Sequence, residues 1–186
     1  MFLQMHFLAI IAQCVLVAVL FGIVHDQITA RICIEYFTIG HPPVFDTTSP
    51  TLLDLGWGVI ATWWAGTILG VPLALAARVG RWPKLTTKDL WRPLTRLLLT
   101  MATLATLRGV AGYSLARWGD LRLWGTLAER IPAERHALFL ADGFAHSASY
   151  LAGFVGGLVL AILTVLRRRK LWKAAESKGP GTVVSS

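Results

Sequence analysis

The chain has 186 residues, of which 55% are hydrophobic and only 15% are charged. This composition excludes an ordinary soluble domain and a disordered chain, and it is typical of an integral membrane protein. The net charge of +8 does not predict a nucleic-acid partner, because the basic residues flank apolar segments and not exposed aromatic ones. We therefore expect the lipid bilayer, and no nucleic acid, around this chain.

Four segments are apolar over about the 20 residues that a helix needs to cross a bilayer. They are residues 7–24, 51–77, 97–116 and 141–166. No Lys or Arg precedes the first segment, so we expect a retained helix and not a cleaved signal peptide. The sequence thus predicts an all-α fold, a four-helix transmembrane bundle in one membrane domain, residues 1–172.

The basic residues predict how the bundle lies in the membrane. Of the 18 Lys and Arg residues, twelve lie in the 78–96 linker and the C-terminal tail, and five lie in the two longer loops, residues 25–50 and 117–140. Short basic segments stay in the cytoplasm. We therefore expect both termini inside, both longer loops outside, and a bacterial inner membrane as the location. Residues 173–186 are predicted to be a disordered cytoplasmic tail.

Small residues recur at every fourth position in two of the predicted spans. The last span carries Ala145, Ser149, Gly153, Gly157 and Ala161, and the second carries Asp54, Gly58, Thr62, Gly66 and Gly70. Such stripes let helices approach closely. We expect them to pack the second, third and fourth helices together. The alternative is that they bind a second copy or another membrane protein, which would make the chain a non-enzymatic assembly subunit.

Ionisable side chains gather at the predicted outer ends of the helices. Asp142 and His146 are one helical turn apart, His25 ends the first span, and Glu35 and His41 follow in the loop. Nitrogen and oxygen ligands of this kind suit zinc, manganese or iron better than calcium. The sequence thus predicts an outward-facing pocket for a divalent metal ion or a small polar ligand. No HExxH motif accompanies these residues, so a hydrogen-bonded polar cluster without metal is the alternative.

Three other functions stay open on the same residues. A metal with a free coordination position would allow hydrolysis at the interface, with Glu35 as the base for a metal-bound water. His25 and His146 are candidates to hold a haem between the first and last helices. A small carrier is the third, although the chain lacks repeats and paired broken helices.

Arg108 interrupts the third span about 18 Å from its inner end, at 1.5 Å per residue. An ionised side chain at this depth is costly unless it is paired. We therefore expect Arg108 to point toward the other helices, within reach of Tyr150 and Ser149. With Asp54, these residues form the predicted ligand-binding group, in which Arg108 is an electrostatic floor. The alternative is an arginine that only locks three helices together.

Short segments near the predicted pocket carry a resemblance. They are His25-Asp26-Gln27, Glu35-Tyr36-Phe37, Gly40-His41-Pro42 and the spaced set Asp142, His146 and Tyr150. In these segments the chain resembles small four-span bacterial inner-membrane proteins, over most of residues 1–170. The resemblance implies a four-helix membrane fold and that location, and it carries no assigned activity.

Overall fold

The structure is a computed structural model that describes residues 2–177. Within that range it is helical, without a strand, and four helical segments are long and apolar enough to cross a membrane. The predicted all-helical fold with four spans is therefore confirmed. Of the predicted tail, residues 173–176 are helical, and residues 178–186 lie outside the described residues.

The helices extend beyond the apolar segments that predicted them. They are α1 (Phe2–Ile32), α2 (Glu35–Thr38), α3 (Pro50–Ile60), α4 (Trp63–Arg78), α5 (Thr87–Trp118), α6 (Gly125–Arg130), the 3-10 turn η1 (Ala133–Arg135) and α7 (His136–Glu176). The first span does not end at residue 24, because α1 continues as a helix to Ile32. Its last two turns carry polar side chains into the bundle.

The second predicted span is broken into α3 and α4 at Ala61 and Thr62. The Thr62 amide donates to the carbonyl of Val59, three residues back, and the Thr62 hydroxyl occupies the carbonyl of Gly58. Irregular backbone at membrane depth is tolerated where it lines a cavity. The break therefore marks a place where a hollow in the bundle is expected.

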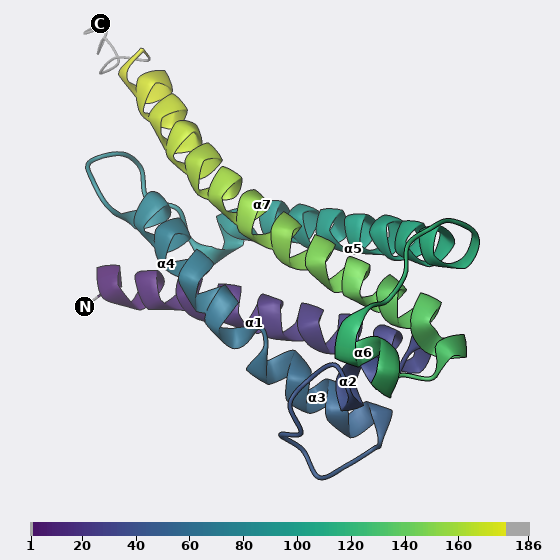
Figure 1. Cartoon of the computed structure of the whole chain (residues 1–186). Coiled ribbons are helices and arrows are strands. Elements are labelled where there is room, and N and C mark those ends of the chain that lie inside the picture. Colours follow the sequence, from purple (N-terminus) through teal and green to yellow (C-terminus); the bar gives the residue numbers. More distant parts are fainter. Residues whose placement is uncertain (1, 178–186) are drawn as a thin grey trace, which may run out of the picture.

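The bundle consists of two groups of helices (Figure 1). One group is α5 with α7, and the other is α1 with α3 and α4. Contacts between α4 and α7 join the two groups, whereas α1 and α5 make few contacts. The start of α1, the loop between α4 and α5 and the end of α7 lie toward one end of the bundle, and α2 and α6 lie toward the other.

The small-residue stripes lie inside this bundle. A Cβ atom on Gly58 would be 2.6 Å from the backbone nitrogen of Ile23 in α1, and one on Gly157 would be 3.0 Å from Leu69 in α4. The last helix therefore uses its stripe for internal packing, as expected. The stripe of the second span was expected to pack against the third and fourth helices. This expectation is wrong, because the stripe packs against α1.

Arg168 closes the end of the bundle where α1 begins and α7 ends. Its side chain is buried and donates to the backbone carbonyls of Ala76, Val79, Trp82 and Pro83. These carbonyls belong to the end of α4 and the loop that follows. The last helix thus fixes the turn between the second and third spans.

Candidate functional site

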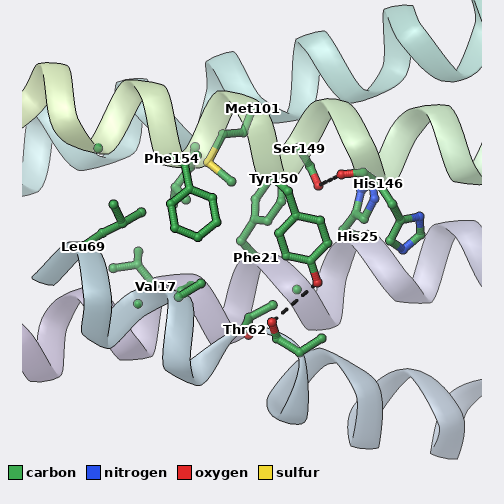
Figure 2. A pocket seen from close by; sticks show the side chains of 18 of the residues that line it. Val17, Phe21, His25, Thr62, Leu69, Met101, His146, Ser149, Tyr150 and Phe154 are labelled. Carbon is green, nitrogen blue, oxygen red and sulfur yellow. Dashed lines mark hydrogen bonds between the residues drawn. The ribbon is translucent and has the colours of Figure 1, made fainter. Parts of the chain in front are cut away.

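An interior cavity of about 140 Å³ runs between α1, α4, α5 and α7. Apolar side chains line one part of it, among them Val17, Leu69, Met101 and Phe154. Polar side chains line the other part, next to the helix break, and they include His25, Asp26, His146, Ser149 and Tyr150. Figure 2 shows this change from an apolar to a polar lining along the cavity.

Asp26 and His146 form the centre of the polar part. Nε2 of His146 lies 3.2 Å from Oδ1 of Asp26, although the two residues are 120 positions apart in the sequence. Both side chains are buried. The contact joins α1 to α7 across the bundle, at the outer end that the sequence predicts.

The hydrogen bonds of His146 determine how many protons this pair holds. Nδ1 lies 2.9 Å from the carbonyl oxygen of Asp142, and because a carbonyl only accepts, Nδ1 donates. The bond between Nε2 and Asp26 then needs one further proton, on the imidazole or on the carboxyl group. In both forms the pair is neutral overall, and its proton lies between the two side chains.

His25 extends this cluster along α1. Its ring meets the ring of His146 edge-on, with centroids 4.5 Å apart, and stacks on Phe21 at 5.7 Å. Its Nε2 is buried and has no hydrogen-bond partner within residues 2–177. The rings of His25 and His146 are therefore in direct contact, and one imidazole nitrogen of His25 has no partner in the described part of the chain.

Aromatic rings cover the polar end of the cavity, next to α2. Tyr36 stacks on His146 with centroids 4.5 Å apart, and the ring of His41 lies 4.7 Å from Trp57. Nδ1 of His41 bonds to the carbonyl of Tyr36 at 2.7 Å, so α2 and the turn after it form one lid. Burial, helped by nearby Tyr150 and acidic groups, raises the pKa of the Tyr36 phenol. Tyr36 therefore keeps its proton at neutral pH.

Tyr150 and Ser149 lie at the cavity wall, as expected, but neither contacts Arg108. The Tyr150 hydroxyl donates to the carbonyl of Ala61 at the helix break, at 3.4 Å, and Ser149 donates to the carbonyl of His146 (Figure 2). The expectation that Arg108 points into the bundle is wrong. Its side chain is exposed on α5, and its guanidinium lies 5.0 Å from the ring centroid of Phe144.

Glu35 is occupied by an ion pair. Both of its carboxylate oxygens accept from Nε of Arg135, at 3.1 and 3.2 Å, and the Cys33 thiol donates to Oε2. Burial alone would raise the pKa of Glu35, but its backbone, Cys33 and Arg135 outweigh it and lower the pKa. Burial and the bond to Glu35 raise the pKa of the Cys33 thiol to about 12. Glu35 thus anchors α2 to the start of α7.

Asp54 is likewise engaged away from the cavity. It is fully buried, and its Oδ2 lies 3.2 Å from Nη1 of Arg31. Arg31 also donates from Nη1 to the side chain of Gln27 and from Nη2 to the hydroxyl of Thr51. This pair fastens α3 to the end of α1. Asp54 is not among the residues that line the interior cavity.

The five residues predicted as metal ligands do not converge on one point. His25, His41 and His146 line the cavity, whereas Glu35 binds Arg135 and Asp142 lines a separate groove. Within residues 2–177, no three His, Cys, Asp or Glu side chains are placed to hold one ion together. Of the five predicted ligands, the three histidines therefore line one cavity, and the two acids, Glu35 and Asp142, are outside its lining.

Asp26 lies at the centre of the polar part of the cavity but is not among the site residues predicted from the sequence. The first span was expected to end at residue 24, which placed Asp26 in a loop. The sequence carries one signal, because Gly22, Asp26, Ala30 and Cys33 follow one another at helical spacing; in the structure all four are buried. A helix extended along that face would have carried Asp26 into the bundle.

Neither a protein-family model nor a curated protein sequence nor a solved structure matches this chain.

Proposed function

We propose that this is a multi-pass membrane protein that binds a small amphipathic molecule in its interior cavity. The observation that carries the proposal is the buried Asp26–His146 hydrogen bond in the polar part of a cavity whose other part is apolar. Ionisable side chains inside a membrane mark ligand or proton sites. An apolar cavity of about 150 Å³ holds benzene, so a cavity of about 140 Å³ suits one aromatic ring with a hydroxyl group.

In this proposal, the polar end of the cavity faces the outside of a bacterial inner membrane and both termini lie in the cytoplasm. The charge distribution supports this orientation. Most basic residues belong to the α4–α5 connection, the start of α5 and the end of α7, away from α2 and α6. Basic segments of this kind are retained on the cytoplasmic side.

A zinc, manganese or iron ion is the other ligand class that the sequence predicts. The donor arrangement favours the organic ligand, because Glu35 is paired with Arg135 and both ring nitrogens of His146 are bonded within the chain. Nε2 of His25 is buried and has no hydrogen-bond partner in the part of the chain that the structure describes, so it suits a hydroxyl donor.

Phenol and benzene are paired probes for this proposal. We expect detergent-purified protein to bind phenol about tenfold more tightly than benzene, because phenol adds one hydrogen bond to His25. His25→Leu should remove the difference and keep benzene binding. His6→Leu, on the exposed start of α1, is the matched control and should change nothing. Titration followed by ligand-observed NMR measures both affinities.

Two results would contradict the proposal. One is equal affinity of the unmodified protein for phenol and benzene. The other is stoichiometric metal by elemental analysis that is lost in His25→Leu, which would favour the ion.

A further inference from the structure

A second hollow lies on the outside of the bundle, between α1 and α5. It is a groove of about 630 Å³, and part of α7 also lines it. Its rims include Val24, Ile28, Leu99 and Val110, whose side chains are more than half exposed. Because these helices are long and apolar enough to cross a membrane, the groove faces the region that lipid chains occupy.

Two side chains that line this groove, His25 and Asp142, have a buried polar atom without a hydrogen-bond partner within residues 2–177; His25 also lines the interior cavity, whereas Asp142 lines only the groove. The hydroxyls of Thr29, Thr95 and Thr106 donate to carbonyls of their own helices. Asp142, by contrast, is 1% exposed, and its Oδ2 has no hydrogen-bond partner within residues 2–177. A buried carboxyl oxygen without a partner is strongly unfavourable, above all inside a membrane. The groove therefore lacks a hydrogen-bonding group at Asp142.

We propose that the groove binds a membrane lipid with a single hydrocarbon chain and a hydroxyl head group, and that the hydroxyl meets Asp142. A hydroxyl both donates and accepts, so it satisfies the carboxyl group in either protonation state. The volume lies within the range of about 300–1,000 Å³ of small-molecule sites. A spanning helix, about 10 Å wide and 30 Å long, is far larger, so a chain fits and a helix does not.

This site is distinct from the interior cavity, although the two are neighbours. Phe21, His25 and Leu98 line both hollows, so these three side chains form the wall between them. The rings of Phe21 and His25 are stacked, at 10° to each other. Asp142 lines the groove and not the cavity, which allows the two sites to be tested separately.

Photoreactive hexadecanol and its methyl ether, compared in lipid nanodiscs that hold the full chain, test the proposal. Both carry the same chain, but only the alcohol donates a hydrogen bond. We expect the alcohol to label peptides of α1 and α5 around Ile28 and Leu99 about tenfold more than the ether. Asp142→Leu, which leaves no orphaned carboxyl group, should reduce alcohol labelling to the level of the ether.

Two further variants separate the groove from nonspecific lipid contact. Ala102→Phe fills the groove and should reduce alcohol labelling about tenfold, whereas Ala111→Phe, on an exposed face of α5 outside the groove, should not. Equal labelling by alcohol and ether would overturn the proposal, and so would labelling that Ala102→Phe leaves unchanged. Labelling confined to α4 around Leu69, which lines the cavity and not the groove, would place the alcohol in the interior cavity; that result overturns the groove and leaves the proposed function standing.

Discussion

Single residues hold this bundle together through specific polar pairs. Glu35 with Arg135, Asp54 with Arg31, and Asp26 with His146 each join two segments that are distant in sequence. A buried charge is unfavourable without a partner. These pairs therefore fix which helices meet, in addition to the apolar packing.

The Glu35–Arg135 pair makes stability depend on pH. Since folding lowers the pKa of Glu35, its contribution is present above the unfolded pKa of about 4.3 and is lost as pH falls through the folded pKa. We expect Glu35→Gln to reduce the free energy of unfolding by about 2 kcal/mol at pH 7, as for a charged hydrogen bond. The deficit should shrink below about pH 4.

Thermal unfolding in detergent across this pH range measures the effect. Glu134→Gln is the control, because Glu134 is exposed and has no hydrogen-bond or ion-pair partner within residues 2–177. A deficit of the same size at pH 3 and pH 7 would show that Glu35 acts by packing and not by its charge.

The site was predictable from sequence only in part at this scale. The i, i+4 spacing placed Asp142 and His146 on adjacent turns, and the end of the first span placed His25 near them. Spacing along one helix does not show which residues of the other helices a side chain contacts. Asp142 thus lines the groove while His146 faces Asp26, and Arg108 lies over Phe144 on an exposed face.

At the scale of helices, the small-residue stripes predict which face of a helix packs closely, but they do not predict which helix packs against it. The i+4 pattern from Gly58 to Gly70 predicts a close approach, and α1 supplies the partner. The break at Thr62 left no clear signal, because its threonine and neighbouring glycines also suit an unbroken membrane helix. Only the hydrogen bonds around Thr62 reveal it.

Gly58 and Gly143 should respond differently to the same substitution. A Cβ on Gly58 would lie 2.7 Å from the Cα of Ile23, so Gly58→Ala forces backbone to move and should destabilise by about 1–3 kcal/mol. A Cβ on Gly143 would meet only Tyr36, at 3.8 Å, so Gly143→Ala should be neutral or stabilising. Melting temperatures in one detergent measure both, and equal losses would refute the close approach.

At the scale of the whole molecule, composition and hydropathy were sufficient to predict four spans. Apolar segments of about 20 residues have few alternatives to a helix in a bilayer. The ends of the helices were harder to predict, because α1, α5 and α7 continue past the apolar region into polar sequence. In these segments the helix continues after the run of apolar residues has ended.

The orientation of the molecule is testable with two engineered cysteines. We expect a membrane-impermeant maleimide to label Asp46→Cys on intact cells, and Lys84→Cys only after permeabilisation, because basic segments stay in the cytoplasm. Both positions are exposed, and the native Cys14 and Cys33 are buried, so background labelling should be low. The reverse pattern would contradict the orientation.

The hydrogen bonds from Arg168 to the end of α4 and the turn after it have a consequence for the order of assembly. The four carbonyls that it binds are synthesised long before Arg168 leaves the ribosome. The first two spans can therefore form early, but the turn between the second and third spans takes its final hydrogen bonds only after translation of the last helix. Completion of this bundle is thus a late step in folding.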